Sequence, residues 1–285
     1  MKYGLELANG GQIADPATLI GLAQDAEIAG WDGIFLEDYV VWQGHANAPT
    51  HDPWVLLAAI ATRTSRVRLG TTVTSISRRR PWKLAKEAVT LDHLSNGRLI
   101  PGVGLGDLGD PGFAAVQEVT PLAQRAAMVD EALELLVLLW SGAPVTFHGR
   151  YFDIDQLPCL PRPLQQPRIP IWIGGNWPTP GVMRRAARYD GFVGGKVHGD
   201  DEDWRLGVPE IHDLKDKIRA TRGSLARFDI ALGGATPRKD VAADRRYVAA
   251  AEAAGATWWM EYANDELGSI DHVRKFIRDG PLARR

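Results

Sequence analysis

Two hydrophobic periodicities alternate along this 285-residue chain and predict a repeating strand–helix order. Between residues 66 and 106, apolar and β-branched residues first alternate over 67–76, as expected for a buried strand. Pro81 then suits the first position of a helix, and apolar residues recur at helical spacing as far as Leu91. Residues 98–104 form a second short strand that ends in glycines. A strand–helix–strand unit of this kind predicts two parallel strands joined by a right-handed crossover.

The same alternation continues on both sides of this unit. Strands are expected at residues 2–8, 33–37, 169–173, 191–194, 228–233 and 257–262, and helices at about 16–29, 53–64, 121–140, 180–188, 208–221, 240–254 and 269–279. Four helices begin at an Asp-Pro or Thr-Pro pair, in which an N-cap side chain precedes a first-position proline. Eight strands and eight helices in strict alternation predict an α/β fold, the (β/α)8 TIM barrel, over an open doubly wound sheet.

Residues 141–168 interrupt this alternation. They are rich in proline and predict a short hairpin followed by an extended arm. Because the strand–helix order resumes after them, we interpret them as an insertion after the fourth helix that lies over the barrel. The sequence thus predicts a single domain over residues 1–285.

Composition narrows the function classes. A net charge of −2 and a pI near 6.4 give no general attraction for nucleic acid or for an anionic membrane. No segment resembles a signal peptide or is apolar enough to span a bilayer, and the one cysteine, Cys159, fits a reducing compartment. We therefore expect a cytoplasmic protein without a nucleic-acid or membrane partner.

In a barrel of this type, function lies at the C-terminal ends of the strands. Several of those ends are glycines, which either leave room for a ligand against the backbone or simply end strands. The best phosphate candidate is the segment IWIGGNWPTPGV, where Gly174 and Gly175 lead from a strand into a helix whose free N–H groups suit an anion. The run Arg78-Arg79-Arg80 is either an anion site or a solvated charge cluster at the start of a helix.

Other chemistries have weaker support. The seven histidines are scattered and no His-x-His ends the first strand, so no metal site is predicted. No nucleophile elbow is present. The polar candidates near the second strand end are Asp38, His45 and His51.

The segment GTTVTSISRRRPWKLAKEAVTLDHLSNGRLIPGVGLG resembles the third-to-fourth-strand region of the bacterial luciferase-like flavin monooxygenases. The segments AEIAGWDGIFLED, DPWVLLAAIATRTSRVRLGT and PIWIGGNWPTPGVMRRAARYDGFV resemble the same family, and the similarity covers roughly residues 2–195. The resemblance implies a (β/α)8 barrel that holds a reduced flavin at the C-terminal strand ends. It also implies a bulge or a non-proline cis peptide near Thr72-Val73, beneath the central ring of the flavin.

The resemblance also implies which residues bind the cofactor. The phosphate would lie beside Gly174, Gly175 and Asn176, in agreement with the independent phosphate candidate. The ring would be supported by the third strand end, including Thr72 and Val73, and lined by Ala8, Asp38, Thr71 and Gly104.

One departure concerns catalysis. Many relatives have Asp-His at the end of the second strand, whereas this chain has Asp38-Tyr39. Three alternatives follow: His45 takes the place of that histidine, Tyr39 acts as a hydrogen-bond donor, or no side-chain base is used.

The resemblance implies an oxidoreductase, with two cofactor alternatives. The favoured hypothesis is a monooxygenase in which reduced FMN, supplied by a flavin reductase or generated from NAD(P)H, reacts with oxygen and a small organic substrate. The alternative is coenzyme F420, a deazaflavin that transfers hydride without oxygen. A non-catalytic flavin-binding subunit and a metal-free phosphate-binding isomerase barrel are further alternatives. A homo-oligomer, specifically a dimer, is expected by resemblance alone.

Overall fold

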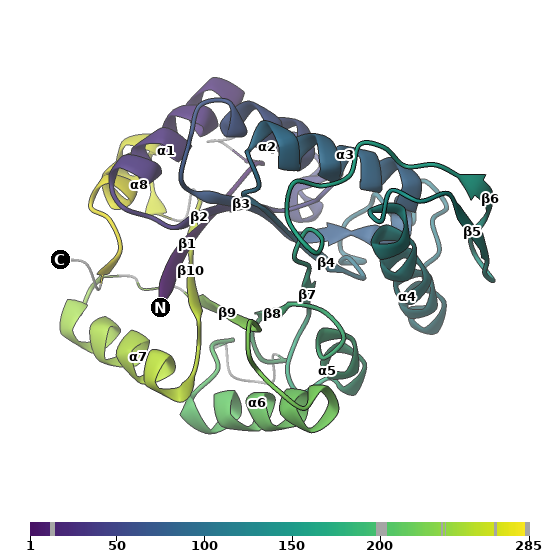
Figure 1. Ribbon diagram of the computed structural model, residues 1–285. Helices are drawn as coiled ribbons and strands as arrows, with labels where there is room; N and C mark the ends of the chain where they lie inside the picture. Colours follow the sequence, from purple (N-terminus) through teal and green to yellow (C-terminus); the bar gives the residue numbers. More distant parts are fainter. Residues whose placement is uncertain (12–14, 198–203, 235, 237, 265–266, 283–285) are drawn as a thin grey trace.

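Eight parallel strands close into a barrel in the computed structural model, which describes residues 1–11, 15–197, 204–234, 236, 238–264 and 267–282 (Figure 1). The strands follow one another around it in chain order, and β1 pairs with both β10 and β2. The bounds are β1 (Lys2–Leu7), β2 (Gly33–Leu36), β3 (Arg68–Ser75), β4 (Leu99–Gly104), β7 (Trp172–Gly174), β8 (Gly191–Gly194), β9 (Asp229–Gly234) and β10 (Trp258–Ala263). The predicted TIM barrel is confirmed.

The helices cover the outside of the barrel (Figure 1). They are α1 (Pro16–Ile28), α2 (Pro53–Ala61), α3 (Pro81–Leu94), α4 (Leu122–Leu139), α5 (Pro180–Ala186), α6 (Val208–Arg222), α7 (Val241–Ala254) and α8 (Ile270–Arg278). The two Asp-Pro starts behave as predicted, since the Asp15 and Asp52 side chains accept hydrogen bonds from backbone N–H groups three residues on, at 2.8 and 2.9 Å. At Thr120-Pro121 the helix begins one residue later than expected, with Pro121 itself at the N-cap.

Aromatic side chains fill the lower interior of the barrel. The Phe35 and Trp172 rings are stacked with their centroids 5.3 Å apart, and Trp258 meets both of them edge-on at 5.9 and 5.3 Å. All three side chains are fully buried. They form a layer of packed rings across the barrel interior, which we call the aromatic floor.

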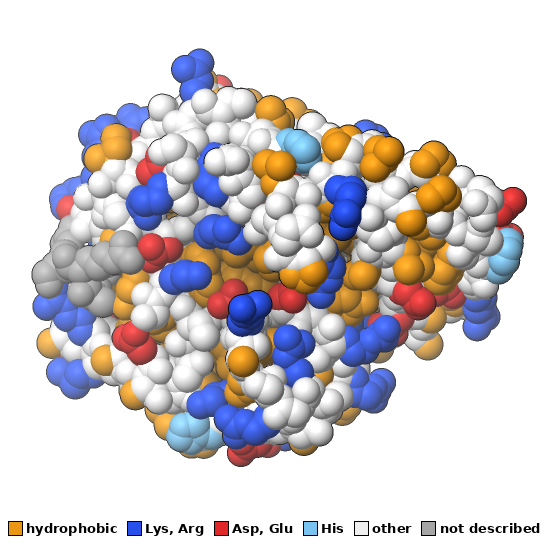
Figure 2. All heavy atoms as spheres, in the orientation of Figure 1, with side chains coloured by type: hydrophobic (Ala, Val, Ile, Leu, Met, Phe, Trp, Pro, Cys, Tyr) orange, Lys and Arg blue, Asp and Glu red, His pale blue; other side chains and the backbone are white. Residues whose placement is uncertain are grey.

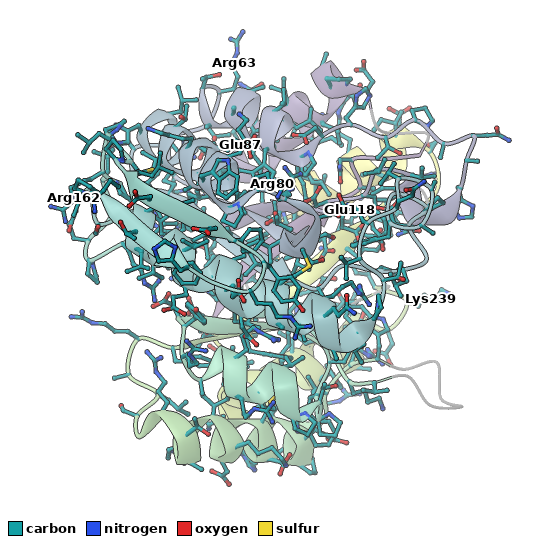
Figure 3. The ribbon with its side chains drawn as sticks, turned by 90° about the vertical axis from the view of Figure 1, so that its right-hand side faces the viewer. Arg63, Arg80, Glu87, Glu118, Arg162 and Lys239 are labelled. Carbon is teal, nitrogen blue, oxygen red and sulfur yellow. The ribbon has the colours of Figure 1, made fainter. Side chains whose placement is uncertain are left out.

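The insertion contains the predicted hairpin, formed by β5 (Val145–His148) and β6 (Asp153–Leu157), and the arm that follows it packs against α3. Gln165 of the arm donates hydrogen bonds to Asp92 of α3 at 2.7 Å and to the Leu99 carbonyl, at the N-terminal end of β4, at 2.8 Å. In Figure 3, Arg162 of the arm lies on the opposite side from Glu118 and Lys239, which follow β4 and β9. The arm therefore lies along the flank and at the N-terminal end of the barrel, away from the strand ends that carry the site.

The β3–β4 register shifts between Thr71 and Thr74, and the Thr72-Val73 peptide is cis. Both features are those that the family resemblance implies at this position. Figure 2, in the orientation of Figure 1, shows apolar side chains recessed at the centre of one face between acidic and basic side chains. None of the described helices is long and apolar enough to cross a membrane.

Candidate functional site

Two adjoining cavities of about 500 and 540 Å³ open at the C-terminal ends of the strands. The first, which we call the glycine cavity, is lined by residues that include Tyr39, Gly104, Asp107, Arg125 and Gly174. The second, the glutamate cavity, is lined by residues that include Glu6, Gln43, Trp204, Gly233, Met260 and Tyr262. The two share Glu37, Thr72, Val73, Gly175 and Asn176, so the bulge in β3 stands where they meet.

Most of the predicted site residues lie together in the glycine cavity: Asp38, Tyr39, Thr72, Val73, Gly104, Gly174, Gly175 and Asn176. The other three line neither of the two cavities. Ala8 is buried at the end of β1, Thr71 is fully buried in the barrel wall, and His45 is exposed in the loop after the short 3-10 turn Trp42–Gly44. The structure thus does not bring the His45 side chain to the cavities.

Thr71 belongs to a buried hydrogen-bond chain behind the cavity wall. Its hydroxyl donates to the Gly102 carbonyl at 2.8 Å and accepts from the Thr74 hydroxyl at 2.9 Å. The Thr74 hydroxyl in turn accepts from the Trp54 indole N–H at 3.0 Å. These bonds tie the bulged end of β3 to both β4 and α2, which fixes the position of Thr72 and Val73.

The glycines at the strand ends accommodate protein side chains. A Cβ atom at Gly174 would lie 2.3 Å from Val73 Cγ1, and one at Gly104 would lie 2.9 Å from Val73 Cγ2. At Gly175, where φ is +152°, it would lie 2.6 Å from Val182 Cγ2. Close packing against protein side chains therefore explains all three glycines, a role different from the two considered from the sequence, and the three residues still line the glycine cavity.

The predicted phosphate candidate has the expected order of strand, turn and helix, from β7 through residues 175–179 to α5. The Gly175 N–H group, however, donates to the Val193 carbonyl at 3.2 Å, and the Asn176 side chain is exposed at the rim. Asn176 and the first turn of α5 are thus the groups here that remain available to an anion.

Ion pairs account for two of the three arginines before α3, and the third, Arg80, is exposed. Arg79 binds the Asp38 carboxylate through two nitrogens, at 2.7 and 2.8 Å, and Arg78 pairs with Asp110 at 2.5 Å. The Asp110 carboxylate also accepts hydrogen bonds from the N–H groups of Val40 and Val41. Both arginines therefore neutralise carboxylates around the glycine cavity, and neither forms an open anion site.

Sequence reasoning missed the carboxyl groups that distinguish the glutamate cavity. Glu37 accepts a hydrogen bond from the Tyr262 hydroxyl at 2.8 Å, and the Gln43 amide donates to that same hydroxyl at 2.7 Å. Burial raises the pKa of Glu37 to about 7, the Tyr262 hydrogen bond opposes this rise, and the charge of Asp107 adds to it. Burial and the charge of Glu37 also raise the pKa of Glu6 well above its ordinary value.

Tyr39 is a neutral hydrogen-bonding group in this setting. Burial, followed by the charge of Glu37, raises the pKa of its phenol well above its ordinary value. Its ring meets Trp42 edge-on at 5.7 Å. Tyr39 is therefore suited to donate a hydrogen bond and not to act as a base, whereas the nearby Glu37 has a pKa of about 7.

One sequence signal could have identified Glu6. It interrupts the apolar residues of the first strand at a position with the same orientation as Gly4, and an acidic residue at an inward-facing barrel position must meet either a partner or a cavity. Glu37 and Tyr262 are 225 residues apart, and their contact depends on closure of the barrel.

The region where the cavities meet fits a flat polar ring. The Thr72 hydroxyl is buried on the cavity wall close to the Glu6 carboxyl group, whose pKa it lowers, and it faces the space open to a ligand. Val73 offers an apolar surface beside it, and Tyr39 offers a neutral hydroxyl. Among the described residues no group of three His, Cys, Asp or Glu side chains could hold a metal ion.

A closed barrel with a bulged third strand and a cavity above it is the geometry that the resemblance implies. The family model described as luciferase-like monooxygenase matches residues 3–276. The chain belongs to this family. In this luciferase-like barrel, the two carboxyl groups of the glutamate cavity come from Glu6 on β1 and from Glu37 directly after β2.

Named relatives of this luciferase-like chain use coenzyme F420. The F420-dependent glucose-6-phosphate dehydrogenase of Nakamurella multipartita is 35% identical over 189 residues, which are 62% of this chain and 52% of that protein. The corresponding protein of Microbacterium testaceum is 34% identical over 219 residues, 73% of this chain and 61% of that protein. The match thus spans only about half to three-fifths of the length of these two relatives.

Solved structures share the fold at lower identity. An F420-dependent secondary alcohol dehydrogenase, in complex with an F420–acetone adduct, has a TM-score of 0.77 at 18% identity and covers 100% of this chain and 99% of its own. The F420-dependent tetrahydromethanopterin reductase of Methanopyrus kandleri has a TM-score of 0.74 at 16% identity, covering 98% of each chain. At these identities the luciferase-like barrel alone is the shared feature.

Proposed function

We propose that this chain is a coenzyme F420-dependent oxidoreductase that transfers hydride to or from a small organic substrate. The observation that carries the proposal is Glu37, a cavity carboxyl whose pKa lies near 7, beside the bulge of β3 in a chain whose named relatives are F420-dependent. Oxidation of an alcohol by hydride transfer also releases a proton. A base with a pKa close to the working pH is suited to accept it.

The cofactor would be held by the residues that the resemblance implies and that line the glycine cavity. Thr72 and Val73 would support the ring, Gly104 and Gly174 would let the strand ends come close, and Asn176 would bind a polar part of the cofactor tail. When bound, coenzyme F420 accepts or donates a hydride. The protein would orient the substrate, exclude water and move the proton through Glu37, with Tyr262 holding the carboxylate in place.

This proposal reverses the order of the two cofactors in the sequence analysis, which favoured reduced FMN and oxygen. The names of the relatives favour the F420 alternative. With F420, neither a flavin reductase nor NAD(P)H is required for the reaction. A homodimer stays a prediction from the family resemblance.

The non-catalytic alternative depended on the replacement of histidine by Tyr39. Glu37 weakens this argument, because it supplies a titratable group one residue after β2 and two residues before Tyr39. The chain belongs to a family of oxidoreductases, and this argues against the phosphate-binding isomerase alternative.

Titration of the purified protein with F420 and with FMN, followed by the fluorescence of each cofactor, tests the proposal. We expect saturable binding of F420 and at least about tenfold weaker binding of FMN. Tighter binding of FMN than of F420 would contradict the proposal and restore the monooxygenase hypothesis.

A pair of variants tests where the cofactor lies. Gly175→Ala and Gly175→Asp both place a Cβ atom against Val182 in a backbone conformation that favours glycine, but only the second adds a negative charge. We expect Gly175→Asp to weaken F420 binding at least about tenfold more than Gly175→Ala does. Equal losses would place the charged part of the cofactor elsewhere.

A further inference from the structure

The two cavities differ in how their acidic groups are compensated. In the glycine cavity, Asp38 and Asp110 are neutralised by Arg79 and Arg78. Arg125 also lines this cavity. Its guanidinium donates to the carbonyls of Leu105 and Gly106 at 3.1 and 3.0 Å. The glycine cavity therefore combines these two paired carboxylates and one fixed cation with Glu37 and Asp107, for which no ion pair is seen in the described part of the chain.

The glutamate cavity lacks such compensation. Glu6 and Glu37 both line it, and the described residues that line it include no lysine, arginine or histidine. Neither glutamate forms an ion pair within the described part of the chain; Glu37 has the neutral Tyr262 hydroxyl as its partner. Two carboxyl groups thus share a partly enclosed space without a basic side chain among the lining residues.

Basic residues nearby in sequence do not alter this distribution. Lys196 follows β8, but it is not among the residues lining either cavity, and its backbone N–H donates to the Trp204 carbonyl at 2.9 Å. Lys196 therefore supplies no cation to the described lining of the glutamate cavity.

Above pH 7, where Glu37 is ionised, a phosphate group in this cavity would meet a negative charge that no basic side chain among the described lining residues balances. Like charges at short range in a partly desolvated site are strongly unfavourable, and such repulsion excludes ligands as effectively as attraction selects them. A hydroxyl or an ammonium group, in contrast, can donate hydrogen bonds to the same carboxyl oxygens.

We infer that the glutamate cavity selects an alcohol that carries no phosphate or carboxylate group, either uncharged or cationic. The inference rests on the proposed function and separates this chain from the named relatives, whose substrate is a sugar phosphate. In the reaction, the carbon–hydrogen bond of the alcohol breaks and its hydride goes to coenzyme F420. The hydroxyl proton goes to the Glu37 carboxylate, and a carbonyl group forms.

The remaining walls fit such a substrate. Trp204 is fixed by close packing, since a Cβ atom at Gly233 would lie 2.1 Å from its ring and one at Gly195 would lie 2.9 Å from it. Met260 and Val193 add apolar surface below, while Gln43 and Tyr262 add neutral polar groups. The cavity can therefore hold an apolar carbon skeleton with its hydroxyl directed at Glu37.

Calorimetric titration with ligands that share a skeleton and differ in charge tests the inference, with and without F420. One set is glucose, glucosamine and glucose 6-phosphate, and a second is glycerol, 3-amino-1,2-propanediol and glycerol 3-phosphate. Uncharged secondary alcohols of three to eight carbons complete the panel. We expect saturable binding among the uncharged or amino members, and at least tenfold weaker binding of each phosphate ester than of its parent.

The double variant Glu6→Gln/Glu37→Gln shows whether the carboxyl groups cause the selection. We expect the gap between phosphate ester and parent to shrink to less than threefold, while the double variant Glu134→Gln/Glu131→Gln on α4 keeps the full gap. A phosphate ester that binds more tightly than its parent, an unchanged gap in the Glu6/Glu37 variant, or no binding by any uncharged or amino member would overturn the inference. Failure of F420 itself to bind, with the charge selection intact, would instead contradict only the proposed function.

Discussion

The lower and upper halves of the barrel interior are built by the same strands but differ completely in chemistry. Phe35 of the aromatic floor and Glu37 of the glutamate cavity are two residues apart, as are Trp258 and Met260, with Tyr262 two residues further along β10. Inward-facing positions alternate along each strand, so two steps along the chain lead from packed aromatic rings to an open cavity.

This comparison separates stability from chemistry. The floor consists of neutral rings in van der Waals and edge-to-face contact, which stabilise the closed barrel. The upper half contains carboxyl groups whose burial raises their pKa, so their ionised form is unfavourable there. A substitution in the floor should therefore lower stability and spare cofactor binding, whereas a substitution of a cavity carboxyl group should alter turnover and the pH dependence of stability.

The largest expected effect is on turnover, from Glu37→Gln. The amide keeps the shape of the side chain but cannot accept a proton, so we expect kcat for alcohol oxidation by F420 to fall about 10²- to 10⁴-fold. In the unsubstituted protein, kcat/KM for oxidation should rise with pH and level off above a pKa of about 7, because the ionised carboxylate is the acceptor. A pH–rate profile that Glu37→Gln leaves unchanged would exclude Glu37 as the base.

In the floor, Phe35→Ala should act on stability. Removing a fully buried ring that stacks on Trp172 should lower the free energy of unfolding by about 3–5 kcal/mol. Denaturant unfolding measures this change, and F420 binding by the folded fraction should be retained. Val55→Ala, at a position on α2 that is 71% exposed, is the matched control and should cost much less. A loss below about 1 kcal/mol at Phe35 would show that the floor is not a main source of stability.

The upper half should in turn make stability depend on pH. Between its ordinary pKa of 4.5 and its folded pKa of about 7, Glu37 is protonated in the folded state but ionised in the unfolded state. The folded state therefore binds more protons there, and the free energy of unfolding falls as pH rises through this range. We expect Glu37→Gln to remove up to about 3 kcal/mol of this fall, measured by unfolding at pH 4.5 and pH 8. Glu134→Gln, at an exposed position on α4, should leave the slope unaltered.

The smallest effect concerns the partner of Glu37. Tyr262→Phe removes a hydrogen bond that favours the carboxylate, so the pKa of Glu37 should rise further. With a net hydrogen-bond energy of about 1 kcal/mol, the inflection of the pH–rate profile should move up by somewhat less than one unit. A shift to lower pH would contradict the assigned direction of the hydrogen bond.

The fold was predictable from the sequence because periodicity and helix starts are local. All eight barrel strands lie within a few residues of their predicted positions; the fifth, predicted at 169–173, is observed at Trp172–Gly174. The irregular β3 end at Thr72-Val73 was expected only from the family resemblance, since no local sequence pattern predicts it. The placement of the inserted arm on the flank was not predictable, since it depends on contacts such as Gln165 with Asp92.

The candidate site was only half predictable, for a physical reason. The glycine cavity is formed by segments with recognisable motifs, and eight of the eleven predicted residues line it. The glutamate cavity depends on Glu37 and Tyr262, which meet only when the first and last strands pair. His45 is near Asp38 in sequence, but the loop leaves its side chain exposed, which periodicity cannot reveal.

The packing around Val73 has an evolutionary consequence. Its two methyl groups occupy the space that a side chain at Gly104 or Gly174 would need, on two different strands. These three positions can therefore vary only together: an alanine at Gly174 becomes tolerable when residue 73 is smaller, and Val73→Ala alone would deepen the cavity. Epistasis of this kind links the depth of the ligand site to the identity of two strand ends, so related barrels should change all three positions as a set.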